Sequence, residues 1–214
     1  MKSIIVSLVT SILTTIYQSF FCCLLLSVMG MFFWLYAKDA SAAGKGYRQA
    51  VKKWIQTFRA KGDFRAFFFW VLYTSMVLFR TFCLRNITAN PFINILGGWW
   101  IRYVDIGNGQ SKLSTDCFEN LIMLLPYMLL LLNYLRQSNY LSTFGFNRIV
   151  KIGISVSFMT SLYIEMTQVF LRIGTFQISD LVYNTLGGAI GSVIYYLFLK
   201  KKERSAGPSE ISHA

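Results

Sequence analysis

Apolar residues dominate five stretches of the chain, each long enough to cross a lipid bilayer as a helix. Four of them are bounded by polar loops, at residues 66–84, 117–135, 152–171 and 181–199. About 20 apolar residues span the hydrocarbon core at a rise of about 1.5 Å per residue. A further run, residues 4–37, is too long for one upright helix, and its spanning part is about residues 18–37. The pattern predicts an all-α, polytopic membrane bundle of five transmembrane helices.

The last two apolar stretches carry polar residues at helical spacing. Glu165, Gln168 and Arg172 fall within about 60° of one another on a helix, and Asp180 and Asn184 share a face of the next one. A charge inside a membrane span costs several kcal/mol unless it faces protein or water. The two polar faces are therefore candidates for one functional site.

Two glycines follow on the face that carries Asp180 and Asn184. Gly187 and Gly191 are four residues apart, a spacing that lets two membrane helices approach closely. We interpret them as helix-packing positions. This interpretation turns the face with Asp180 and Asn184 toward the interior of the bundle.

The basic residues predict the orientation of the chain. Most of the 21 lysines and arginines lie in three segments, residues 38–65, 136–151 and 200–204, which five spans place on the same side. The positive-inside rule assigns that side to the cytoplasm, so the N-terminus is expected outside and the C-terminus inside. We divide the chain into an N-terminal helix with a basic loop (1–65), a four-helix membrane domain (66–200) and a disordered cytoplasmic tail (201–214).

The basic loop has a pattern of its own. Tyr47, Val51, Trp54 and Phe58 recur at helical spacing among cations, which predicts an amphipathic helix on the anionic cytoplasmic leaflet. Nucleic-acid binding is the alternative for a basic run, but the adjacent spans favour the membrane. A signal peptide ending near Ala42 is a second alternative, and the long apolar run argues against it.

Composition fits a membrane protein and narrows the chemistry. Hydrophobic residues make up 55% of the chain and charged residues 14%, with a net charge of +12. The four cysteines show no metal-ligand spacing, and the one histidine, His213, is in the tail. We expect no metal and no cofactor. Cys83 and Cys117 both lie near the predicted outer face, and the sequence leaves a disulfide between them open.

The predicted topology places the polar residues in one layer near the outer leaflet. Arg80 and Glu165 both lie in the outer third of a core of about 30 Å. Glu119 and Asn120 enter the third span from outside. One interpretation is an ion pair between Arg80 and Glu165 that only locks the bundle. The other, favoured by the number of polar groups, is a pocket that binds a headgroup.

The outer loop, residues 85–116, is rich in aromatic residues. It contains Asn90, Pro91 and Phe92, followed by Trp99 and Trp100. Tryptophan prefers the headgroup region, so the loop is expected to lie on the outer leaflet or to dip into it. The sequence leaves open whether it is an aromatic belt or a lid over the polar layer.

These features together resemble the VanZ family over about residues 70–198. The resemblance is carried by Asn90-Pro91-Phe92, Asn120 with Pro126, Ser161, Glu165, Gln168, Asp180, Asn184, Gly187 and Gly191. The family consists of small multi-span bacterial membrane proteins named for a component of glycopeptide resistance associated with teicoplanin. The resemblance points to Asn120, Glu165, Gln168, Arg172, Asp180 and Asn184 as the family's polar positions.

Two features depart from the family pattern. The chain has Tyr127 and Met128 where the family tends to have a glycine after the proline, and residues 1–65 look like an added N-terminal element. Neither departure touches the polar layer.

Three functions follow as hypotheses. The first is a non-enzymatic protein of the bacterial plasma membrane that lowers susceptibility to teicoplanin-type lipoglycopeptides. It would contact membrane lipids and bind the headgroup of a lipid-linked cell-wall precursor or of the drug. The second is an intramembrane enzyme acting on such a precursor, with Glu165 and Asp180 as acid and base and Arg80 or Arg172 on a phosphoryl group. The third is a transporter or channel, against which the lack of an internal repeat argues unless the chain forms an oligomer.

Overall fold

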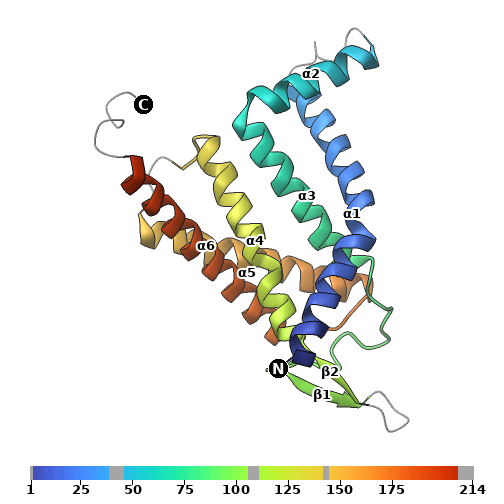
Figure 1. Cartoon of the computed structure of the whole chain (residues 1–214). Coiled ribbons are helices and arrows are strands. Elements are labelled where there is room, and N and C mark those ends of the chain that lie inside the picture. The colour runs from blue at the N-terminus through green and yellow to red at the C-terminus, as the bar shows by residue number, and fades with distance from the viewer. Residues whose placement is uncertain (1, 39–45, 106–110, 142–144, 207–214) are drawn as a thin grey trace.

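The structure, a computed structural model, describes residues 2–38, 46–105, 111–141 and 145–206. Within these residues the chain forms helices and one short β-hairpin (Figure 1). The elements are α1 (Lys2–Lys38), α2 (Tyr47–Ala60), α3 (Gly62–Phe82), β1 (Arg102–Asp105), β2 (Ser111–Ser114), α4 (Asp116–Gln137), α5 (Phe146–Leu171) and α6 (Ile178–Ala206).

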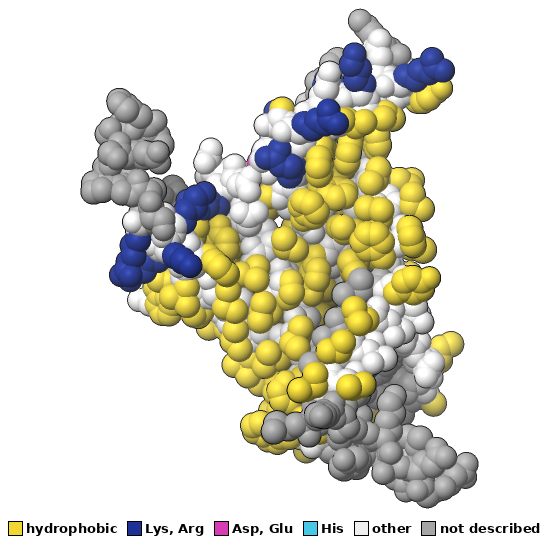
Figure 2. All heavy atoms as spheres, in the orientation of Figure 1, with side chains coloured by type: hydrophobic (Ala, Val, Ile, Leu, Met, Phe, Trp, Pro, Cys, Tyr) yellow, Lys and Arg dark blue, Asp and Glu magenta, His cyan; other side chains and the backbone are white. Residues whose placement is uncertain are grey.

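Five of the helices in the described part of the chain are long and apolar enough to cross a membrane. The spanning segments are Tyr17–Lys38, Gly62–Phe82, Asp116–Gln137, Phe146–Leu171 and Ile178–Lys202. Their outward side chains form a broad apolar surface along the bundle (Figure 2). The predicted all-α membrane bundle with five spanning helices is confirmed.

The bundle has two ends, which we name after the elements that lie there. The hairpin end holds β1 and β2, the C-terminus of α3 and the N-termini of α4 and α6 (Figure 1). The α2 end holds α2 and the C-terminus of α6. Lysine and arginine side chains gather at the α2 end on the face shown in Figure 2. The charge asymmetry predicted from the loops is thus an asymmetry between the two ends of the bundle.

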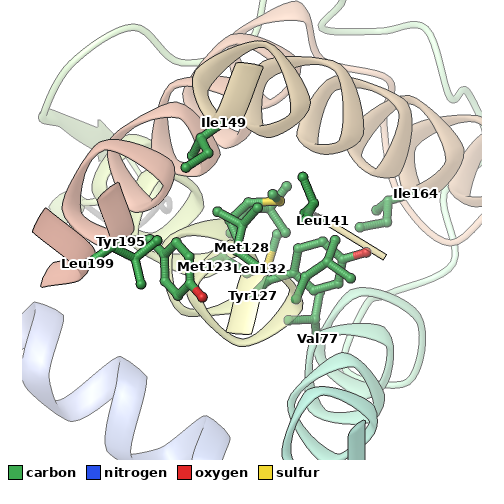
Figure 3. Packing of buried hydrophobic residues seen from close by; sticks show 12 residues of the cluster. Val77, Met123, Tyr127, Met128, Leu132, Leu141, Ile149, Ile164, Tyr195 and Leu199 are labelled. Atoms are coloured by element: carbon green, nitrogen blue, oxygen red, sulfur yellow. The ribbon is translucent and has the colours of Figure 1, made fainter. Parts of the chain in front are cut away.

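The main core lies where α4 packs against its neighbours. Leu124, Met128 and Leu132 of α4 are completely buried, and they pack with Ile149 of α5 and Tyr195 of α6 (Figure 3). Contacts between α4 and α6 and between α5 and α6 are the most extensive, whereas α3 packs mainly on α4 and α1 and only slightly on α5. Helix α3 is therefore joined to the main core through its contact with α4.

Glycines allow α4 and α6 to pack at backbone distance. A Cβ atom at Gly187 would overlap the carbonyl oxygen of Leu121, and one at Gly191 would come within 2.6 Å of the carbonyl oxygen of Leu125. Because both obstacles are backbone atoms, side-chain rearrangement cannot relieve them. The close contact holds the N-terminal parts of α4 and α6 side by side.

A second apolar cluster joins α1, α2 and α3 at the α2 end. Met31 and Phe64 are completely buried in it, and Trp54 and Phe58 of α2 pack against it. The rings of Trp54 and Phe58 are stacked with centroids 5.2 Å apart. The helix predicted for the basic loop is confirmed as α2, and part of its apolar face is used against the bundle.

The hairpin was not predicted from the sequence. Strands β1 and β2 pair antiparallel, with Arg102 opposite Ser114 and Asp105 opposite Ser111. The hairpin leads directly into the first turn of α4. At the C-terminal end of the chain, α6 continues to Ala206. Residues 207–214 of the predicted tail lie outside the described residues.

Candidate functional site

Polar side chains from three helix ends line a pocket of about 240 Å³ at the hairpin end. They come from the C-terminal end of α3 and the segment after it, from the first turns of α4, and from the start of α6 with the residue before it. The lining residues are Arg80, Leu84, Arg85, Asp116, Glu119, Asn120, Gln177 and Asp180.

The charges of the pocket match the helix ends that carry them. Asp116 and Glu119 lie in the first turn of α4, and Asp180 lies in the first turn of α6. The N-terminus of a helix carries a partial positive charge and unpaired N–H groups, so acidic residues are stabilised there. Arg80 lies in the last turn of α3, where the partial charge is negative. Helix ends of both polarities therefore meet around one cavity.

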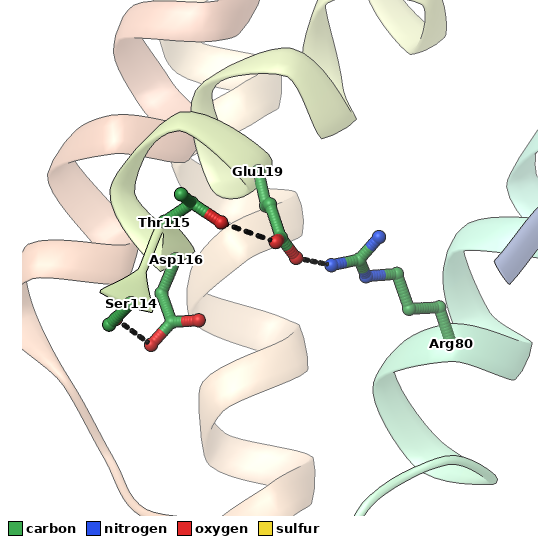
Figure 4. Close-up of polar contacts among 5 residues, drawn as sticks. All are labelled: Arg80, Ser114, Thr115, Asp116 and Glu119. Atoms are coloured by element: carbon green, nitrogen blue, oxygen red, sulfur yellow. Dashed lines mark hydrogen bonds and ion pairs between the residues drawn. The ribbon is translucent and has the colours of Figure 1, made fainter. Parts of the chain in front are cut away.

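Arg80 forms an ion pair with Glu119 across the pocket (Figure 4). The hydroxyl of Thr115 donates a hydrogen bond of 2.9 Å to the other oxygen of Glu119. The side chains of Arg80 and Glu119 are 25% and 11% exposed. The predicted ion pair between Arg80 and Glu165 is wrong. Arg80 turns toward α4 because α3 packs on α4, whereas its contact with α5 is slight.

Glu165 does not line the pocket, but it holds the backbone of a residue that does. Its side chain is 2% exposed and accepts a hydrogen bond of 2.9 Å from the backbone N–H of Gln177. That bond ties the connection between α5 and α6 to the body of α5. The side chain of Gln177 then lines the pocket, and its amide donates to the hydroxyl of Thr175.

The segment after α3 is tied to the same connection. The backbone N–H of Thr88 donates to the carbonyl of Arg172, that of Phe176 donates to Pro91, and that of Ile178 donates to Ile95. Three backbone bonds thus hold the aromatic outer loop against the connection that carries Gln177.

The loop also presents apolar side chains on its surface. Trp99 is 45% exposed with its ring near that of Tyr183, and Trp100 is 74% exposed. The loop therefore borders the pocket region, and its role as belt or lid stays a prediction.

The remaining predicted residues do not line the pocket, and two of them form contacts between helices. The amide of Gln168 donates to the carbonyl of Thr81 at 3.0 Å, and the amide of Asn184 donates to the hydroxyl of Ser161 at 2.9 Å. Arg172 caps α5 in a left-handed conformation, with φ 55°, and its side chain is exposed.

Four of the eight predicted headgroup residues therefore line the pocket: Arg80, Glu119, Asn120 and Asp180. Of the residues of the enzyme hypothesis, Arg80 and Asp180 line the pocket, whereas Glu165 and Arg172 do not. Cys83 and Cys117 are free cysteines.

Three charged or polar lining residues were missed in the sequence. Arg85 and Asp116 fall in the segment treated as the outer loop, and Gln177 lies between two spans. Each lies within about one helical turn of a span that also carries a predicted pocket residue. Extending the search by one turn beyond each span would have found them.

The pocket combines charges of both signs with amide groups. Arg80 and Arg85 supply cations, and Asp116, Glu119 and Asp180 supply carboxylates. Among the described residues, no group of three or more His, Cys, Asp or Glu side chains has the arrangement of a metal site. The pocket offers hydrogen bonds and ionic contacts to a small polar group.

One comparison with known proteins identifies a family. A family model described as VanZ/LLP1 matches residues 2–199. The match is longer than the resemblance seen over residues 70–198, and it includes the N-terminal helix and the basic segment. Comparison with curated proteins and with solved structures gave no significant match.

Proposed function

The chain belongs to the VanZ/LLP1 family of membrane proteins, and on that premise we propose that it lowers the susceptibility of a bacterium to teicoplanin-type lipoglycopeptides. In this proposal the protein resides in the bacterial plasma membrane. Its pocket at the hairpin end binds the headgroup of a lipid-linked cell-wall precursor or of the drug. The observation that carries the proposal is a polar, charged pocket at the ends of three spanning helices.

The position of the pocket supports a headgroup as the ligand. It is built from the last turn of α3 and the first turns of α4 and α6, where spanning segments end. Ends of spanning helices lie at the level of lipid headgroups. A lipid or a lipidated drug in the same leaflet would carry its polar group to that depth.

The charge asymmetry supports an outward-facing pocket. On the face shown in Figure 2, lysine and arginine side chains gather at the α2 end, opposite the hairpin end. Under the positive-inside rule the α2 end faces the cytoplasm. The pocket would then open on the outer leaflet, where glycopeptides act without crossing the membrane.

The lining groups suit the chemistry of such ligands. The guanidinium of Arg85 can bind phosphate or carboxylate through two parallel hydrogen bonds. The amides of Asn120 and Gln177 can donate to and accept from sugar hydroxyls or peptide groups. The volume of about 240 Å³ admits a headgroup rather than a whole glycopeptide. It lies below the roughly 300–1,000 Å³ typical of pockets for drug-sized ligands.

Expression in a susceptible Gram-positive host tests the proposal. We expect the inhibitory concentration of teicoplanin, which carries a lipid chain, to rise more than that of vancomycin, which carries none. Arg85→Gln should remove most of the protection, because it deletes a charged contact worth about 1.5–3 kcal/mol. Arg59→Gln, at the α2 end, is the matched control and should retain protection.

Two results would contradict the proposal. Equal protection against both drugs would point to a general envelope effect. No protection against either drug, with the protein verified in the membrane, would rule out resistance as its function.

A further inference from the structure

The ionic contacts of the pocket leave its charges unbalanced. Arg80 and Glu119 neutralise each other in their ion pair. The other charged lining residues are one cation, Arg85, and two carboxylates, Asp116 and Asp180. Among the side chains that the structure describes, which exclude those of residues 102–113, none of these three forms an ion pair. The pocket therefore holds one more negative than positive charge.

We propose that the pocket binds a zwitterionic headgroup, with a primary ammonium held by Asp180 and Asp116 and a phosphate or carboxylate held by Arg85. This inference rests on the proposed function, because it names the chemistry of the ligand in the same pocket. An alkylammonium beside an anionic group occurs both in aminophospholipids and in small soluble phosphoamines. The experiment below distinguishes these sources.

Asp180 is a buried carboxylate that lines the pocket. Its side chain is only 7% exposed, and it accepts a long hydrogen bond, 3.4 Å, from the hydroxyl of Ser179 and another from the amide of Asn120. Arg85 acts on it electrostatically, but the two form no ion pair, so its negative charge is hydrogen-bonded without being neutralised. A buried carboxylate is costly unless it is paired and hydrogen-bonded. A ligand ammonium offers three donors and a full positive charge.

Asp116 can complete the ammonium site from the neighbouring helix. One of its oxygens accepts a hydrogen bond of 2.8 Å from the hydroxyl of Ser114, and its side chain is exposed (Figure 4). The second oxygen receives no bond from the other residues drawn in Figure 4. Because α4 and α6 are locked together at Gly187, their first turns hold Asp116 and Asp180 on the same pocket.

A competing explanation is that these acids only compensate the partial charges of helix N-termini. That role needs no cavity between them and no amide lining. It also makes no distinction between ligands with and without an amine. Selectivity for the amine therefore separates the two explanations.

The test uses purified full-length protein in detergent and isothermal titration calorimetry. Dihexanoyl phosphatidylethanolamine is compared with its N-acetylated derivative, which keeps the phosphate and the chains but loses the ammonium. We expect the amine lipid to bind about tenfold or more tightly, the effect of one charge-assisted contact. O-phosphoethanolamine, which lacks acyl chains, shows whether a soluble ligand is sufficient.

Variants locate the effect within the pocket. Asp180→Asn should abolish the preference for the amine lipid, whereas Arg85→Gln should weaken the binding of both lipids. Asp63→Asn, in the first turn of α3 at the α2 end, should change neither. The lipid comparison on the unaltered protein decides the question even where a variant fails to fold.

The outcomes separate this inference from the proposed function. Equal affinity for the two lipids would overturn the ammonium site and leave a headgroup pocket in place. An unchanged amine preference in folded Asp180→Asn would also overturn it. Failure of both lipids and of O-phosphoethanolamine to bind would overturn the ammonium site, whereas absence of protection against either drug is the result that overturns the proposed function.

Discussion

At the scale of single residues, the ion pair between Arg80 and Glu119 determines the character of the pocket. It joins α3 to α4 and neutralises two of the five charges that line the cavity. It is neither fully buried nor fully exposed, so its contribution should lie between that of surface pairs and that of buried pairs. The pair also keeps Arg80 from serving as a free anion site.

Neutralising one partner should cost more than neutralising both. We expect Arg80→Gln or Glu119→Gln alone to lower stability by about 2 kcal/mol, because each leaves one charge without its partner. The double variant should recover most of that loss. Thermal melting in detergent measures both effects, and Arg59→Gln, an exposed change on α2, is the control.

The exchanged variant Arg80→Glu with Glu119→Arg gives a sharper comparison. It should restore stability, since the pair is re-formed with reversed polarity. The same exchange between Arg80 and Glu165 should not restore it. Rescue by the Glu165 exchange, and not by the Glu119 exchange, would contradict the pairing seen in the structure.

At the scale of elements, the contact between α4 and α6 positions the carboxylates of the pocket. Gly187 of α6 faces the carbonyl of Leu121 on α4, where no side-chain atom fits. Asp180 lies about two turns before Gly187, and Glu119 lies half a turn before Leu121. A shift of α6 away from α4 would therefore change the spacing of the pocket walls.

Gly187→Ala should separate the two helices and destabilise the protein by about 1–3 kcal/mol, the usual cost of overpacking. Gly30→Ala is the matched control, because a Cβ atom at Gly30 meets no atom within 4 Å. That control should leave the melting temperature unchanged or raise it slightly, since alanine is the better helix former. Equal effects of the two substitutions would contradict close backbone packing at Gly187.

At the scale of the whole molecule, the two ends of the bundle should face opposite sides of the membrane. In a protein freed of its four cysteines, Ile87→Cys probes the hairpin end and Tyr140→Cys the α2 end. Both native side chains are well exposed, at 86% and 69%. We expect an impermeant thiol reagent applied to intact cells to label Cys at 87 and not at 140, because the positive-inside rule assigns the basic end to the cytoplasm.

Permeabilised cells provide the control, in which both positions should react. Labelling of position 140 in intact cells would place the basic end outside. The pocket would then open toward the cytoplasm, and an outer-leaflet headgroup would not reach it.

The spanning helices could be predicted from sequence because the bilayer imposes their length and composition. Every backbone polar group in the hydrocarbon core must be paired within the protein, so a run of about 20 apolar residues has few alternatives to a helix. Helix α2 was predictable from a different signal, because its apolar residues repeat at helical spacing. The hairpin between β1 and β2 lies outside the spanning segments, where the bilayer does not impose length or composition. The sequence therefore did not predict it.

The sequence by itself determined the number of spans, the family and the end of the bundle at which polar residues gather. The tertiary structure decided which of those residues share a cavity. Depth along a helix follows from counting residues, but the direction of a side chain depends on how the helices pack. Arg80 and Glu165 have similar predicted depths, yet Arg80 meets Glu119 because α3 packs on α4, and Glu165 holds the backbone of Gln177.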